Sequence, residues 1–449
     1  MSVRTGSVAA ILAAIAVCGA PYGASAQSLE DALAVAYRTN PTIRAERARL
    51  RATEELKAQA WANALPQITA SGSYQKVDET QVINSAVIGG GTGATEQQFD
   101  LNTVTGGVQG EQVIFAGFRN YNAIKQARAR VRAGGAQLAA TEQSVLLDVA
   151  TAYFDVLRDT TIFDSNRNQV EVLLRQLDEA QARFRVGEVT RTDVSQAEAR
   201  LAGARARLSG AQAQLAISRS RYVELVGEAP GTLEEAPPLP EVPESHDAAQ
   251  ALGAIYAPAV IVARENETAS RKQVAIAKGV FLPRVSLTAG YQYAEEPSSF
   301  TLSDEQFTYG ARASIPIFQG GLNLSRVREA RALADSAEAG VEEAERRVGA
   351  QVTGAWEQLI AARTTITAAR AQVDANRLAL EGVRRESQLG ARTTLDVLDA
   401  EQELLNAEVQ LATAQRDERA AAFGLLAASG VLTLDAIGVD PESVIPAED

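Results

Sequence analysis

Apolar residues recur at spacings of four and three along two long stretches of the chain. The first stretch carries Val149, Tyr153, Val156, Thr160, Phe163, Val170, Leu174, Leu177 and Phe184. The second carries Val352, Trp356, Leu359, Ile366, Val373 and Leu380. This heptad spacing predicts long helices that pack as coiled coils. A helix continuous from Asn120 to Val186 would measure roughly 100 Å at about 1.5 Å per residue. Heptads alone specify only helix packing, so a plain coiled-coil stalk would show the same stripes.

A different periodicity, alternation of apolar and polar residues, marks shorter segments. Val285, Leu287, Ala289, Tyr291 and Tyr293 share one parity, while Arg284, Ser286 and Gln292 have the other. We predict four strands per chain, at residues 67–78, 103–116, 284–294 and 306–318. Each strand would have an apolar face and a polar face in contact with water. Four strands cannot close a barrel with a lumen. Such a sheet would aggregate or share its open edges with copies of itself.

The sequence contains an internal duplication. ALPQITASGSYQ (64–75) matches FLPRVSLTAGYQ (281–292) at an offset of 217, and from VIFAGFRN (113–120) and PIFQGGLN (316–323) onwards the offset is 203. We therefore predict two units, 27–228 and 249–438, each with a helix that ends at Leu-Pro, two strands and two long helices. Residues 229–248 are rich in proline and predict an extended linker. Residues 439–449 form an acidic tail.

The first 26 residues have the parts of a secretory signal: Arg4, the apolar run from Val8 to Val17, and the small residues Ala24 to Ala26. We expect the mature chain to start at Gln27. A lipoprotein cut before Cys18 is the alternative, although Val17 stands where a small residue is required. Cys18 is the only cysteine, so the mature chain has no disulfide, thiol nucleophile or cysteine metal site.

Composition excludes several classes of protein. No stretch after the leader reaches the roughly 18 apolar residues of a spanning helix, so an exported chain would be periplasmic, secreted or an outer-membrane β-barrel. The formal charge of -13 repels nucleic acid. His246, the only histidine, lies in the predicted linker, and no G-x-S-x-G, H-E-x-x-H or Walker segment occurs. We expect no enzyme activity, no cofactor and no metal site, and interpret the glycine run at 89–94 as an extracellular loop.

Several motifs together resemble the TolC-type outer-membrane efflux proteins, and they recur in order over Ser28 to about Gly438. They are SLEDALAVAYRTNPTI, the LPQ and LPR strand openings, IFAG and IFQGG, ATAYFDVL, RFRVGEVTRTDV and LGARTTLDVLDA. The resemblance implies a mixed α+β membrane protein of the outer membrane that extends into the periplasm. It implies a homotrimer whose protomers supply four strands each to a 12-stranded β-barrel, continuous with an α-helical tunnel.

The function implied by the resemblance is an outer-membrane exit duct for efflux or secretion, with an inner-membrane transporter, a periplasmic adaptor and outer-membrane lipid as partners. The two glycine motifs would be the turns at the periplasmic tips of two helical hairpins, because glycine allows the positive φ of such a reversal. The adaptor would dock near these tips, at Val186, Gly187, Leu389 and Gly390.

Two aspartates match the acidic constriction of the family. Asp396 and Asp399 lie three residues apart near the start of the last long helix, so they share a face. Acidic residues are common in a first helical turn because the helix dipole and free amides favour them. In a trimer, however, the pair would give six carboxylates around one axis. We expect such a ring to raise some pKa values and to attract multivalent cations.

Arg392, Asp193 and Thr192 match contacts that close the family's tunnel between hairpins of neighbouring chains. An exposed arginine–carboxylate pair contributes about 0 to 1 kcal/mol, which suits a contact that must open. The sequence departs from the family at Ser387, where a tyrosine could reach Asp193. Closure would then depend on Arg392 alone, or on Arg191 and Glu188 at the other tip.

Two other functions fit part of the pattern. A type I protein-secretion outlet would have the same sequence features, because the inner-membrane pump selects the cargo. A periplasmic coiled-coil adaptor would have one hairpin and no lipid-facing strands, whereas this sequence predicts two hairpins and four strands.

Overall fold

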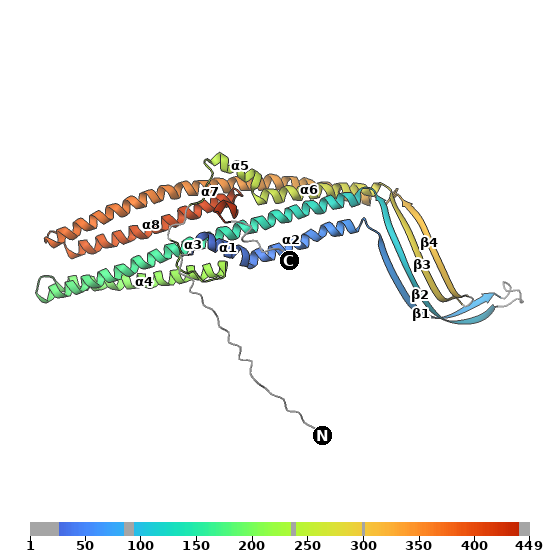
Figure 1. Cartoon of the computed structure of the whole chain (residues 1–449), viewed down its shortest axis with the longest axis horizontal. Coiled ribbons are helices and arrows are strands. Elements are labelled where there is room, and N and C mark those ends of the chain that lie inside the picture. Colours follow the sequence, from blue (N-terminus) through green and yellow to red (C-terminus); the bar gives the residue numbers. More distant parts are fainter. Residues whose placement is uncertain (1–26, 85–93, 235–238, 299–300, 440–449) are drawn as a thin grey trace, which may run out of the picture.

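The computed structural model describes residues 27–84, 94–234, 239–298, 301–439. The predicted signal segment, nearly all of the glycine run and all of the acidic tail after Val439 lie outside these residues. The described chain is elongated, with a curved sheet at one end and two helical hairpins at the other (Figure 1). Within the described residues, no helix is both long enough and apolar enough to cross a bilayer.

Both halves of the chain fold into the same order of elements. The first half contains α1 (Leu29–Thr39), α2 (Pro41–Ala62), β1 (Gln67–Asn84), β2 (Ala94–Ala116), α3 (Arg119–Arg185) and α4 (Arg191–Val226). The second contains α5 (His246–Tyr256), α6 (Pro258–Lys278), β3 (Arg284–Ser298), β4 (Thr301–Ser314), α7 (Leu322–Gln388) and α8 (Thr394–Ala428). Short 3-10 turns follow α6 and α8, at Gly279–Phe281 and Asp435–Ile437.

Two helices, rather than the one predicted, precede the strands in each half, and the second of each pair ends shortly before Leu-Pro, as predicted. Pro41 and Pro258 each begin a new helix, because proline is tolerated at the first helical position but not inside a helix. The predicted linker, 229–248, also extends too far along the chain. Ser245 caps α5 by accepting a hydrogen bond from the Ala248 amide at 3.1 Å, so His246 lies in a helix rather than in the linker.

The four strands form one antiparallel sheet in the order β1-β2-β3-β4. At the end of the sheet away from the helices, all four strands extend beyond the predicted segments, because polar residues there obscure the alternation. β4 ends earlier than predicted, at Ser314 rather than 318. Pro316 cannot donate a backbone hydrogen bond, and none of the described strands pairs with the free side of β4.

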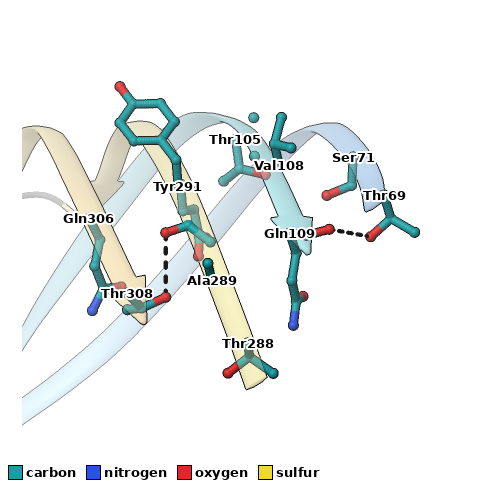
Figure 2. Close-up of a pocket in the computed structure, with 14 residues that line it drawn as sticks. Thr69, Ser71, Thr105, Val108, Gln109, Thr288, Ala289, Tyr291, Gln306 and Thr308 are labelled. Carbon is teal, nitrogen blue, oxygen red and sulfur yellow. Dashed lines mark hydrogen bonds between the residues drawn. The ribbon is translucent and has the colours of Figure 1, made fainter. Parts of the chain in front are cut away.

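As predicted, one face of the sheet is mainly polar and the other carries apolar side chains. A hollow on one face is lined mainly by threonine, serine, glutamine and glycine, including Thr69, Ser71, Gln109, Gln306 and Thr308. Figure 2 shows Gln109 and Gln306 extending to one side of the sheet and Val108 and Tyr291 to the other. The opposite face exposes large apolar side chains, among them Ile68, Tyr74, Phe307 and Tyr309.

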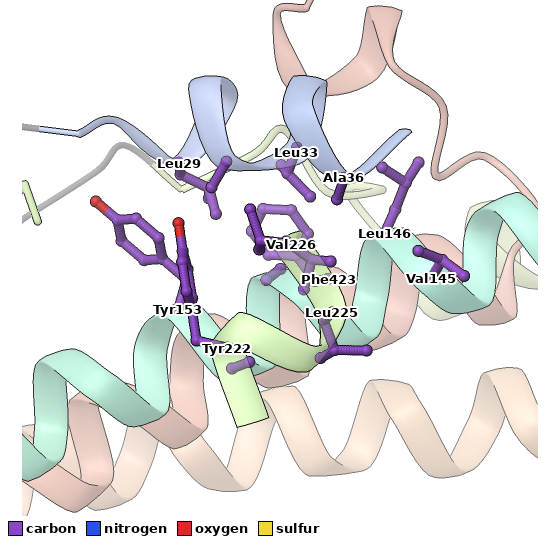
Figure 3. Close-up of a cluster of buried hydrophobic side chains, with 14 of the residues drawn as sticks. Leu29, Leu33, Ala36, Val145, Leu146, Tyr153, Tyr222, Leu225, Val226 and Phe423 are labelled. Carbon is purple, nitrogen blue, oxygen red and sulfur yellow. The ribbon is translucent and has the colours of Figure 1, made fainter. Parts of the chain in front are cut away.

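A hydrophobic core lies midway along the molecule, where α1 packs on α3, α4 and the C-terminal segment (Figure 3). The Tyr153 hydroxyl donates to the Gln27 carbonyl at 2.9 Å and accepts from the Glu234 amide at 3.0 Å. Burial raises the pKa of Tyr153 to about 12. This tyrosine therefore ties the start of the described chain and the segment after α4 to the long helix α3.

The heptad stripes are buried as predicted in the second half, where Val352, Leu359, Ile366, Val373 and Leu380 are all core residues. In the first half the stripe is correct near the core and partly correct toward the tip, where Val170 and Leu177 pack against a buried cluster. Leu173 is buried there, whereas Leu174 and Phe184 are exposed. The pattern is ambiguous because two leucines are adjacent and, around Leu173, the helix packs against both α4 and α8.

Candidate functional site

Each helical hairpin reverses at a glycine in the left-handed backbone region. Gly187 has φ of 79° and Gly390 has φ of 77°. A Cβ atom added to either glycine would meet no other atom within 4 Å. The glycines are therefore needed for backbone conformation and not for space. The residues before them, Val186 and Leu389, are 72% and 85% exposed, so both tips present an apolar side chain to solvent.

Equivalent capping boxes begin the return helices after the two turns. Asp193 accepts hydrogen bonds from the amide and hydroxyl of Thr190, both at 2.8 Å. Asp396 accepts the same two bonds from Thr393 at 2.9 Å. These hydrogen bonds stabilise the charged carboxylates and lower the pKa values of Asp193 and Asp396. In a single chain, the pKa of Asp396 is thus shifted opposite to the direction expected for a crowded ring.

The residues predicted to close a gate form local contacts within the chain. Arg392 donates to Glu386 at 2.9 Å, and Asp193 is engaged in its capping box. Thr192 and Arg191 are exposed at the start of α4, and Glu188 forms an ion pair with Arg183 at 3.2 Å. Within one chain, the structure does not bring Arg392 to either of its predicted partners.

Sequence reasoning missed a buried carboxylate between the two hairpins. Glu401 on α8 is 3% exposed, and its Oε1 atom accepts hydrogen bonds from Arg384 at 2.8 Å and from Gln176 of α3. Its Oε2 atom has no hydrogen-bond partner among the residues that the structure describes. The equivalent residue in the first half, Glu198, is exposed, so the duplicated Ala-Glu motif gives no sign of this difference.

Further contacts join the two hairpins of one chain. Asp399 accepts from Arg200 at 2.5 Å, and Gln402 accepts from Arg207 at 2.7 Å. Beside these polar contacts, a small apolar cluster is formed by Leu173, Leu201, Ala204 and Leu398. The hairpins α3–α4 and α7–α8 therefore form one unit near their tips, and Asp399 belongs to the contact between them.

Ser387 lies in a cavity between the two tips. The cavity has a volume of about 200 Å³, and Gln176, Arg183, Arg384 and Thr394 also line it. The small side chain of Ser387 leaves room at the position where a tyrosine would extend toward the other hairpin. Among the described residues, no three His, Cys, Asp or Glu side chains are grouped closely enough to hold a metal ion.

Comparison with known proteins shows what the chain is similar to. The family described as outer membrane efflux protein matches residues 32–228 and 255–431. The outer membrane efflux protein BepC of Brucella suis is 31% identical over 426 residues, which cover 95% of this chain and 90% of BepC. The alkaline protease secretion protein AprF of Pseudomonas aeruginosa is 27% identical over 299 residues, with 65% of this chain and 62% of AprF covered.

The fold also matches a solved outer-membrane protein. The structure of VceC from Vibrio cholerae superposes with a TM-score of 0.75 at 22% identity, covering 90% of this chain and 96% of VceC. The sequence match spans both halves of the chain, and the structural match includes the sheet as well as the hairpins. This chain belongs to the outer membrane efflux protein family.

Proposed function

We propose that three copies of this chain form a passive exit duct that crosses the outer membrane and extends into the periplasm. The observation that carries the proposal is the combination, in one chain, of a sheet that has one apolar face and, among the described strands, two free edges, with two helices of 67 residues. Three sheets of four strands would close a 12-stranded barrel without free edges. The hairpins would continue the barrel as a helical tunnel.

In this duct the protein performs no chemistry. An inner-membrane transporter would supply the energy, and a periplasmic adaptor would dock at the hairpin tips, on the exposed Val186 and Leu389 beside Gly187 and Gly390. An exposed apolar residue on a turn suits such docking because its burial would stabilise the complex. Binding would open the duct if the adaptor has a higher affinity for the open arrangement than for the closed one.

We assign the constriction of the duct to Asp396 and Asp399, and its closing contacts to Arg392, Asp193 and Thr192. All five residues lie within two turns of the hairpin tips, and four of them are charged. Arg392 has its present contact with Glu386 at an exposed position, so exchange for a carboxylate of a neighbouring copy would cost little free energy.

Two cargo classes are compatible with the fold. The name of BepC refers to efflux, and that of AprF to secretion of a protease. Because a transporter would load the duct, we propose small-molecule efflux first, on the higher identity and coverage of BepC, and type I protein secretion second. A periplasmic adaptor is not favoured, since the chain has two hairpins and a sheet.

Conductance of the purified protein in planar bilayers tests the duct and its gate together. Wild type should give a small, stable conductance, and Arg392→Ser should increase it, because a closing contact is lost. Arg346→Ser is the matched control, since Arg346 forms a similar exposed ion pair, with Glu342, far from the tips. Equal conductance in all three proteins would remove Arg392 from the gate, and absence of any conductance would argue against a duct.

A further inference from the structure

The two hairpins of the sheet have the same register once the duplication is taken into account. In the first hairpin Gln67 lies opposite Glu111, and in the second Arg284 lies opposite Ser314. The offsets of 217 and 203 convert the first pair into the second. The same offsets convert the ion pair Arg47–Glu142 into Arg264–Glu345. The halves are therefore equivalent residue by residue in both the sheet and the helices.

The contact between the halves can consequently be used to derive the contact between copies. Within the chain, β2 of the first half pairs with β3 of the second, and Gly107 lies opposite Gln292. β4 is equivalent to β2, and β1 is equivalent to β3. We propose that β4 pairs with β1 of a neighbouring copy in this same register, with Gly310 opposite Gln75 and Arg312 opposite Ser73. The proposal rests on the duct described above, and it specifies the seam between its subunits.

The proposed register keeps the faces of the sheet continuous. On β1 the polar face carries odd-numbered residues such as Ser71 and Ser73, and on β4 it carries even-numbered ones such as Thr308 and Arg312. The seam pairs odd residues of β1 with even residues of β4. A shift by one residue would place the apolar side chains of one strand among the polar side chains of the other.

The seam also accounts for the apolar segment after β4. Ile317 and Phe318 are 95% and 85% exposed and lie outside the strand. Their region is equivalent to Val113–Phe115 of β2, where the pairing with β3 contains a bulge. Carried over, this bulge places Phe318 opposite Ile68 of the neighbouring copy. The extra residue of the bulge is then Ile317, directly after Pro316, and a bulge is one of the few places where a sheet tolerates proline.

The helices beside the sheet support the same seam. Within the chain α3 packs on α6, with Arg132 bonded to Glu265 at 2.7 Å and Gln126 bonded to the Ala269 carbonyl at 3.2 Å. Ala129 and Ala133, three and seven residues after Gln126, share its side of α3 and are buried. The equivalent residues of α7, Ala332 and Ser336, are exposed. On α6 Ala269 is buried, whereas the equivalent residue of α2, Ala52, is exposed. Small side chains that permit close packing are therefore uncovered on α7 and α2, and the neighbouring copy would cover them.

One position departs from the equivalence. A Cβ atom on Gly279 would lie 2.4 Å from the Gly117 carbonyl oxygen, so the halves approach closely there. The residue equivalent to Gly279 in the first half is Ala62. The methyl group of Ala62 requires the backbones to lie slightly farther apart at this junction. At the end of the strands next to the helices, the seam between copies is thus wider than the contact within a chain.

Cysteine cross-linking can test the proposed register of β4 and β1 directly, because the mature chain would contain no cysteine of its own. A Cβ atom on Gly107 would lie 3.8 Å from the Cβ atom of Gln292, which is the spacing of a disulfide. The equivalent pair across the seam is Gly310→Cys with Gln75→Cys, and two residues along it is Arg312→Cys with Ser73→Cys. The exchanged pairs, 310 with 73 and 312 with 75, use the same four cysteines out of register.

After mild oxidation, the two in-register variants should form covalent dimers and trimers on non-reducing gels, roughly tenfold faster than the exchanged pairs, because disulfide geometry is strict. Gly107→Cys with Gln292→Cys should oxidise within the chain and give no ladder. Faster cross-linking of an exchanged pair would overturn the register. No cross-linking of any pair in particles that still have the mass of three chains would overturn the seam but leave the duct intact. Monomeric particles would overturn both.

Discussion

At the scale of single residues, the contact between the two helical hairpins depends on one buried carboxylate. Glu401 is almost inaccessible, whereas the equivalent Glu198 is solvent-exposed. A buried carboxylate requires partners because loss of water around the charge costs free energy. Gln176 and Arg384 supply these partners from the other hairpin and from the adjacent helix. Glu401 therefore holds the two hairpins of one chain together, in addition to any contact between chains.

Glu401→Ala should destabilise the protein by about 1–3 kcal/mol, since Gln176 loses its partner and Arg384 keeps only water. Glu198→Ala is the matched control and should change stability by less than about 0.5 kcal/mol. The free energies of unfolding can be compared by denaturant titration followed by circular dichroism. Equal effects of the two substitutions would show that burial of Glu401 contributes nothing.

The lowered pKa of Asp396 has a consequence for the conduction of ions. A carboxylate with a lowered pKa stays charged to a lower pH than an ordinary aspartate, and its charge is lost only as the pH falls through the lowered value. In an Asp399→Ala channel, block by a trivalent cation such as hexamminecobalt should persist below pH about 3.9, the ordinary aspartate pKa.

This block is measured in planar bilayers as a function of pH, with the cation on the periplasmic side. Asp396→Ala combined with Asp399→Ala should abolish it. If the double variant is blocked as tightly as wild type, the aspartates do not form the constriction. A midpoint above pH 5 in the single variant would mean that repulsion between copies outweighs the hydrogen bonds from Thr393.

At the scale of elements, the turns are distinguished from the helices by backbone conformation. Gly390 has positive φ with open space around it, whereas Gly382 lies in the helix α7, also with open space for a Cβ atom. Gly390→Ala should destabilise by about 1–2 kcal/mol because an L-residue is strained in the left-handed region. Gly382→Ala should stabilise by about 1 kcal/mol, because alanine is the better helix former.

Thermal unfolding of the two variants checks this difference, because the same chemical change should move the midpoint in opposite directions. A fall in both midpoints would mean that a neighbouring copy covers Gly382. An unchanged midpoint for Gly390→Ala would mean that the turn at this tip adopts another backbone conformation in the assembled protein.

The sequence allowed most of the elements to be predicted, because periodicity reports which side of an element is buried. The stripe from Val352 to Leu380 and the alternation from Val285 to Tyr293 are examples. The prediction failed where two apolar residues are adjacent, as at Leu173 and Leu174. It also missed the site contacts of Glu401, since the spacing that marks a helix face does not say which neighbouring helix covers it.

At the scale of the whole molecule, the chain is incomplete by itself. In the part of the chain that the structure describes, β1 and β4 each lack a partner on one side, and large apolar side chains such as Phe307, Tyr309 and Ile317 are exposed on the sheet or beside it. A single copy in water would have free strand edges next to an apolar surface, which promotes aggregation. Closure with other copies and insertion in lipid would remove both features.

The mass of the particle that mild detergent extracts from outer membranes tests this account most directly. We predict that the protein fractionates with outer membranes and that the extracted particle contains three chains, because three four-stranded sheets close one barrel. Single-particle mass measurement in detergent gives the number of copies without labelling. A soluble monomer recovered from the periplasm would contradict the account.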